Sequence, residues 1–192
     1  MVIVMVKKYY GVAVNDLIHE YRSLGKRSSD CPINRKWRDM IRRCYDKAYK
    51  QKNAKYADCS VCSGWLYFSN FKKWVESQDW EGKELDKDIL SKGSSIYSPS
   101  TCMFVDRKIN MLVTGLNYGC GAHYVEKRKK YQSSVKNSVT GKLEYLGLYE
   151  NRKDAESAYN KRKKQIIISF ADSISDDFLA SKLKEYAETV HD

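Results

Sequence analysis

A change of periodicity near residue 130 constrains the fold more than any other feature of the chain. Residues 130–136 alternate polar and less polar side chains, as a half-exposed strand does. Residues 142–149 have an extended pattern after the turn signal Thr140-Gly141. Asn151 then suits a helix N-cap, and helical spacing of apolar residues follows it. We therefore expect a small antiparallel sheet backed by one helix.

Earlier in the chain the apolar residues have helical spacing. Residues 33–50 and 65–75 each place aromatic and aliphatic side chains on one face, which predicts two amphipathic helices. Residues 102–105 resemble a short strand, and residues 107–113 the start of a helix. Basic residues lie between the apolar positions of the first helix and form either a solvated face or a phosphate-contacting one. They are Arg35, Lys36, Arg38, Arg42 and Arg43.

The ends of the chain and one glycine-rich stretch indicate how it is divided. Three glycines within residues 115–121 predict a domain boundary. Residues 1–6 are apolar but too short for the core of a signal peptide, so we expect a first strand or a buried end. Residues 175–177 predict the start of a last short helix, in a tail too acidic to be a nucleic-acid arm.

The charge balance favours a polyanionic partner. Lys and Arg total 35 against 24 Asp and Glu, which gives a formal net charge of +11. The densest basic run is residues 127–130, followed by Lys136 and Lys142. The chain contains no apolar run long enough to cross a bilayer, so we expect no membrane partner.

The cysteines leave a zinc site open. Without a secretion signal we expect all six to be reduced. Cys59 and Cys62 have zinc-knuckle spacing, and Cys44 and Cys102 would complete a four-thiolate site. The alternative is that these cysteines are buried as small apolar residues.

The predicted sheet has one free face. By strand alternation Lys130, Gln132, Ser134 and Lys136 share it, while the residues between them point to the helix. Two- and three-stranded ribbons fit the major groove of B-DNA, where Gln pairs with adenine and Lys with guanine. A merely solvated face is the alternative.

Residues 121–168 resemble the plant ethylene-response (APETALA-type) DNA-binding domain in the form carried by phage homing endonucleases. The resemblance lies in residues 130–135, 141–142, 145–149 and 154–159. It implies that the sheet face reads the major groove through Tyr124, Arg128, Lys130, Gln132, Ser134, Lys136 and Tyr145. Tyr145 falls where plant members have tryptophan. Lys127, Lys142, Arg42 and Arg43 complete the set of DNA-binding candidates.

The N-terminal half resembles the HNH nuclease domain of the same phage proteins. The resemblance lies in residues 11–16, 37–45, 59–65, 68–71 and 85–88. An HNH site needs a histidine that deprotonates water and ligands that hold one divalent metal. Here Asp86 fits the motif and Asn110 its third position, but Lys87 replaces the histidine and Thr101 the central asparagine. With a reference pKa of about 10.4 against about 6.5, lysine is no substitute for histidine as the base.

Together these features predict an α+β protein with three parts. They are a degenerate HNH-like domain over residues 1–114, an APETALA-type domain over 118–170 with three strands and one helix, and an acidic helix over 171–192.

The resemblance implies a sequence-specific binder of double-stranded DNA that represses phage genes without cutting. We expect no catalytic residue, metal or cofactor, and a place in the cytoplasm of the bacterial host. An active metal-dependent HNH homing endonuclease is the alternative, and an RNA-binding or protein-interaction module is a third. A homodimer on a repeated site and a monomer on an asymmetric site are both compatible with the sequence.

Overall fold

The computed structural model describes residues 8–91, 93–113 and 121–190 and has an α+β fold. The expected first strand at residues 1–6 and most of the glycine-rich boundary lie outside the described residues. The chain divides into two compact units. Unit 1 extends to Lys87 and also includes Gly93–Phe104, whereas unit 2 comprises Asp88–Lys92 and the chain from Val105 onward.

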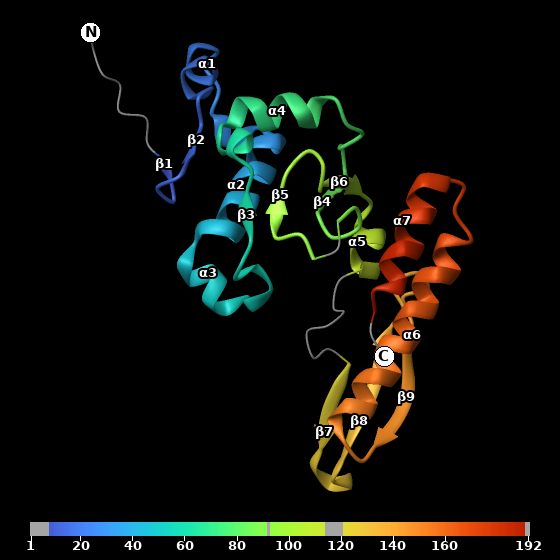
Figure 1. Cartoon of the computed structure of the whole chain (residues 1–192). Coiled ribbons are helices and arrows are strands. Elements are labelled where there is room, and N and C mark those ends of the chain that lie inside the picture. The colour runs from blue at the N-terminus through green and yellow to red at the C-terminus, as the bar shows by residue number, and fades with distance from the viewer. Residues whose placement is uncertain (1–7, 92, 114–120, 191–192) are drawn as a thin grey trace. The chain divides into compact units, whose positions relative to one another are not determined.

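Unit 1 consists of short strands around a helical core (Figure 1). Its helices are α1 (Ile18–Ser23), α2 (Pro32–Tyr45), α3 (Lys47–Lys52) and α4 (Phe68–Glu76). Three 3-10 turns are η1 (Ser28–Asp30), η2 (Ala54–Tyr56) and η3 (Ser63–Leu66). Its strands pair as β1 (Lys8–Tyr9) with β2 (Ala13–Val14), β3 (Ser60–Val61) with β5 (Ile96–Tyr97), and β4 (Glu84–Asp86) with β6 (Met103–Val105).

The core of unit 1 is aromatic. Trp37 of α2 is fully buried, and its indole N–H donates to the carbonyl of Trp65 over 2.7 Å, so this large side chain leaves no polar atom unsatisfied. Phe68 and Phe71 of α4 are also fully buried, and the Phe68 ring lies 5.5 Å from that of Trp37. Burial of these rings fixes α2 against α4 and leaves the basic side of α2 outside.

The first predicted helix is interrupted at Asp46. This residue has an extended backbone and accepts a hydrogen bond from the amide of Tyr49 over 3.1 Å, so it caps α3. Residues 33–50 therefore form two helices instead of the single one that their apolar spacing predicted.

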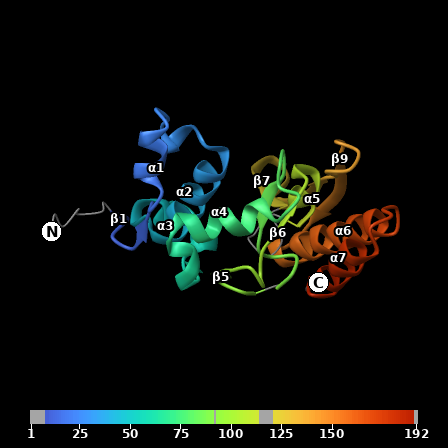
Figure 2. The ribbon, with the colours of Figure 1, turned by 90° about the horizontal axis from the view of Figure 1, so that it is seen from above.

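Unit 2 contains the expected three-stranded sheet. The strands β7 (Ala122–Val125), β8 (Lys130–Lys136) and β9 (Leu143–Tyr149) are antiparallel in that order, and the 3-10 turn η4 (Glu126–Arg128) joins the first two. Helix α6 (Arg152–Ala171) runs along one face of the sheet, and α7 (Asp177–Glu188) packs on α6 (Figures 1 and 2). Asn151 caps α6 as predicted, because its side chain accepts from the amide of Asp154 over 2.9 Å.

The division between the units lies earlier than residues 114–118. Helix α5 (Arg107–Val113) belongs to unit 2, where the buried Lys163 donates to the Met111 carbonyl over 3.1 Å. The Tyr186 hydroxyl of α7 donates to the Val113 carbonyl over 2.8 Å. The C-terminal helix is likewise part of this unit and not a separate segment. Such contacts are distant in sequence, so glycine content did not reveal them.

Candidate nucleic-acid interface

The sheet of unit 2 has a covered face and an open face. On β8, Ser133 and Val135 are fully buried and face α6. Glu144 lies opposite Val135, and its carboxylate accepts from Arg162 of α6 over 2.6 Å, which confirms that this is the helix side. The alternate residues of β8 therefore lie on the open face, as strand alternation predicted. They are Lys130, Gln132, Ser134 and Lys136.

Neighbouring strands extend this open face. Directly opposite residues share a side of the sheet, so His123 and Leu148 flank Gln132, and Tyr145 lies beside Ser134. Tyr145 is 61% exposed. His123 is exposed as well, and the sequence analysis missed it because residues 122–125 show no alternation.

A β-bulge places Tyr145 on the open face. The register shifts between Ser133, opposite Gly147, and Ser134, opposite Tyr145, so Leu146 is the extra residue. In an uninterrupted ladder Tyr145 would lie opposite Val135, on the helix side. Gly147 has φ +133, a backbone conformation that favours glycine.

Tyr124 lies on the other side of the sheet from the position expected by resemblance. It pairs with Tyr131, whose side of β8 is that of Ser133 and Val135, and the two rings are 5.1 Å apart. Its ring is still 45% exposed. On β7 the open face is therefore provided by His123 and Val125 instead of Tyr124.

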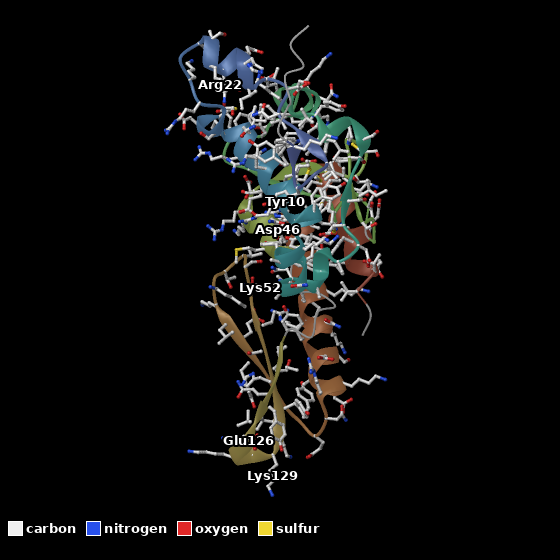
Figure 3. The ribbon with its side chains drawn as sticks, turned by 90° about the vertical axis from the view of Figure 1, so that its left-hand side faces the viewer. Tyr10, Arg22, Asp46, Lys52, Glu126 and Lys129 are labelled. Carbon is white, nitrogen blue, oxygen red and sulfur yellow. The ribbon has the colours of Figure 1, made fainter. Side chains whose placement is uncertain are left out.

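Basic side chains stand at both ends of β8. Lys127 and Arg128 are exposed in η4, at the tip of the β7–β8 hairpin where Figure 3 labels Glu126 and Lys129. Lys129 has the left-handed φ of 48° that turns the chain back into β8. At the opposite end Lys136 and Lys142 are exposed around the β8–β9 turn. A polyanion crossing the open face would meet cations at each end.

Lys130 already has an acidic partner. Its Nζ lies 2.6 Å from a carboxylate oxygen of Glu150, and the two side chains are 41% and 75% exposed. A pair this exposed is worth about 0–1 kcal/mol, so an incoming phosphate or base could replace Glu150 at small cost.

Arg42 and Arg43, the two DNA-binding candidates in unit 1, differ in their surroundings. Arg42 is exposed, lies over the ring of Tyr49 with 4.9 Å between guanidinium and centroid, and is 3.7 Å from Asp39. Arg43 is half-buried, lies near the side chain of Tyr97 and is 5.9 Å from the ring of Tyr56. Arg43 therefore has a role inside unit 1, whereas Arg42 is available at the surface.

In the stretch that resembles an HNH motif, Lys87 and Thr101 make hydrogen bonds to the backbone of neighbouring loops. Lys87 Nζ donates to the carbonyl of Ser94 over 3.2 Å and lies 5.9 Å from the Tyr97 ring. Thr101 Oγ1 donates to the Ile96 carbonyl over 2.7 Å and accepts from the Ser98 amide over 3.0 Å. Asp86 is buried at the end of β4. Asn110 lies on α5, in unit 2.

Two of the four proposed zinc ligands, Cys44 and Cys102, are buried thiols. Burial, then the nearby Cys59, raises the pKa of Cys44 to about 12, and burial also raises the pKa of Cys102 to about 12. Zinc binds thiolates, so each of these two would first have to lose a proton that burial holds. Within the part of the chain that the structure describes, no group of three or more His, Cys, Asp or Glu is arranged to hold a metal ion.

Comparisons with protein-family models, with characterised proteins and with solved structures find no match to this chain. The family resemblance therefore depends on the residues quoted for it. Among the described helices, none combines the length and apolar character needed to cross a membrane.

Proposed function

We propose that the chain is a sequence-specific binder of double-stranded DNA that occupies its site without cutting it. The observation that supports this best is the open sheet face, where Gln132 and Lys136 project from a strand with exposed cations at both ends. A ribbon of this size fits the major groove. Gln132 would read adenine, Lys130 or Lys136 guanine, and the terminal cations would hold the phosphates.

The substituted nuclease stretch supports occupancy without cleavage. Lys87 donates to a carbonyl and lies near an aromatic ring. A lysine, with a reference pKa of about 10.4, is a poor proton acceptor at neutral pH, and its cation would oppose a divalent metal beside Asp86. Thr101 uses its hydroxyl on the Ser98 and Ile96 backbone and has no amide with which to replace asparagine.

The central experiment selects a target duplex from phage DNA and measures affinity for that target and for a scrambled duplex. Gln132→Ala should weaken binding to the target by about 1–3 kcal/mol, roughly 5- to 150-fold, and leave the scrambled duplex unaffected. Gln78→Ala is the matched control, because Gln78 is an exposed glutamine that follows α4 in unit 1. If Gln132→Ala binds the target with the same affinity as wild type, the open sheet face is not the surface that reads the sequence.

A cleavage assay separates this proposal from an active nuclease. The retained Asp86 at the end of β4 is the feature that favours the alternative. We expect no nicking of target plasmid with Mg²⁺ or Mn²⁺. Metal-dependent nicking that disappears in Asp86→Asn, a nearly isosteric change, would establish an HNH-type enzyme instead.

Repression of phage genes in the bacterial cytoplasm is the biological role that we propose, because the resemblance is to phage proteins. The chain should repress a reporter gene placed behind the selected site, and Gln132→Ala should no longer repress it.

Sedimentation of the protein with and without its duplex distinguishes a homodimer from a monomer. A gel shift with single-stranded RNA tests the third alternative. On the open face, as far as the structure describes it, the exposed rings on which bases could stack are those of Tyr145 and His123.

A further inference from the structure

Unit 1 contains a basic pocket of about 580 Å³ on the outer side of α2. It is lined by Lys8, Tyr9 and Tyr10 from the β1–β2 hairpin and by Arg35, Arg38, Asp39 and Arg42 from α2. Four cationic groups thus face one carboxylate, and all four are exposed. We propose that this pocket binds phosphate groups of the DNA backbone, so that unit 1 provides a second DNA contact; this inference rests on the proposed function.

Aromatic rings hold two of the guanidinium groups in place. Arg38 lies over the ring of Tyr9 at 5.4 Å and Arg42 over the ring of Tyr49 at 4.9 Å. A guanidinium that lies over a ring can still direct its N–H edge to a phosphate through two parallel hydrogen bonds, although that of Arg42 also lies 3.7 Å from Asp39. Because the side chain is already ordered, less conformational entropy is lost on binding.

The hairpin wall of the pocket adopts an unusual conformation. Tyr10 has a φ of 50°, which is uncommon for a residue with a side chain, and its side chain lies near Asp46, the cap of α3 (Figure 3). Burial, and then the neighbouring Asp46 carboxylate, raise the pKa of Tyr10, so the phenol stays neutral at physiological pH. Backbone strain of this kind persists where surrounding contacts enforce it, and it clusters at binding sites.

Arg35, Arg38 and Arg42 form a basic row along α2, and the length of this row favours a DNA strand over a single anion as the ligand. Arg35 and Arg42 are seven residues apart, which is about 10.5 Å along a helix. Phosphates of one DNA strand advance by about 3.4 Å along the duplex axis, so the row spans about three of them. Asp39 lies within the row, 3.7 Å from Arg42, and would disfavour a compact, highly charged ligand at that point.

The test compares charge-removing variants inside and outside the pocket in the full chain. Arg35→Gln and Arg38→Gln should weaken binding to target and scrambled duplexes by the same factor, because phosphate contacts carry no sequence information. Raising the salt concentration from about 50 to about 200 mM lowers the affinity of the wild type. The same change should lower the affinity of each variant by a factor about 3.5 times smaller, because each variant has lost one phosphate contact. Arg22→Gln on α1 and Lys52→Gln on α3 remove the same charge outside the lining residues and should change both quantities less (Figure 3).

Several outcomes would overturn the inference. Pocket variants that match the Arg22→Gln and Lys52→Gln controls would show that only net charge matters. Inorganic pyrophosphate that binds wild type but not Arg38→Gln, with duplex affinity unchanged in both pocket variants, would assign the pocket to a free phosphate ligand.

The failure of this inference and that of the proposed function are distinguishable. If Gln132→Ala loses target preference and the pocket variants have no effect, the proposed function is supported and the inference about the pocket is wrong. If the pocket variants have lower affinity and lower salt dependence while Gln132→Ala binds like wild type, the pocket binds DNA but the sheet does not read its sequence. Melting curves of Arg35→Gln and Arg38→Gln that match wild type exclude unfolding as the cause, and Arg38→Lys tests whether charge alone suffices.

Discussion

At the scale of single residues, the ion pair with Glu150 would compete with the DNA contact that we propose for Lys130. The Glu150 carboxylate lies 2.6 Å from the Lys130 ammonium group and adds a negative charge beside the open face. Glu150→Gln should therefore tighten binding to the target duplex by about two- to fivefold, the range expected for an exposed ion pair. Fluorescence anisotropy at low salt measures this change.

Glu156→Gln is the matched control for Glu150. Glu156 is paired with Arg152 at 2.7 Å on α6, on the covered side of the sheet, and its loss changes the net charge by the same amount. An equal gain in affinity from both variants would contradict a specific role for the Lys130–Glu150 pair.

Among the glycines of unit 2 that the structure describes, Gly121 has the closest neighbour to an added side chain. It has φ +93, and a Cβ atom there would overlap the ring of Tyr159 and come within 2.8 Å of that residue's own Cβ. Because the Tyr159 Cβ cannot rotate away, Gly121→Ala should lower the free energy of unfolding by about 3 kcal/mol or more. Urea unfolding followed by circular dichroism measures the loss.

The control for Gly121 is Gly141→Ala. Gly141 also has a positive φ, +74, but no atom lies within 4 Å of an added Cβ. This variant should lose only the backbone term of about 1–2 kcal/mol. Similar losses in both variants would show that the close approach of Tyr159 does not matter.

At the scale of elements, an ion pair ties β9 to α6 and makes their packing depend on pH. Hydrogen bonds from Arg162 and then from Asn137 lower the pKa of Glu144. A carboxylate whose pKa is lower in the folded state stabilises that state above its unfolded pKa of about 4.3, and the stabilisation is lost as pH falls through the folded pKa. Both partners are partly exposed, so the contribution is about 0.5 kcal/mol.

Glu144→Gln should therefore be slightly less stable than wild type at pH 7 and equal to it near pH 3. Parallel urea titrations at the two pH values measure the gap, with Glu126→Gln as an exposed carboxylate of the same unit for comparison. A constant gap between wild type and Glu144→Gln at both values would mean that the charge of Glu144 is not involved.

Strands β8 and β9 and helices α6 and α7 of unit 2 were predictable, because their signals are local, whereas β7 shows no alternation. Alternation along β8, the caps Asn151 and Asp176 and the turn before β9 all lie within a few residues of the elements they define. The bulge at Leu146 and the side of Tyr124 were not, since both depend on which residues face each other across strands. Asp46 was missed because apolar spacing continues through it, although its side chain favours a helix cap.

At the scale of the whole molecule, the candidate site combines segments that no local pattern connects. The pocket of unit 1 needs a hairpin that ends at Val14 and a helix that begins at Pro32, and their contact brings Lys8 to the same opening as Arg42. Sequence analysis recognised the basic face of α2 but not its aromatic supports. The proposal for the pocket of unit 1 and the proposal for the sheet face of unit 2 thus name the same kind of ligand, duplex DNA, and each can be tested by itself.

A net charge of +11 with exposed cations on both units should make DNA binding steeply salt-dependent. Six or more phosphate contacts would lower the affinity about 10³-fold or more between about 50 and 200 mM salt. The slope of log affinity against log salt should be similar for target and scrambled duplexes, because both release the same counterions, while base contacts of the open face set a constant offset between the two lines. Titrations at four salt concentrations on each duplex measure slope and offset separately. A flat slope would argue against nucleic acid as the partner, and coincident lines would leave the chain a non-specific binder whose sheet face reads no bases.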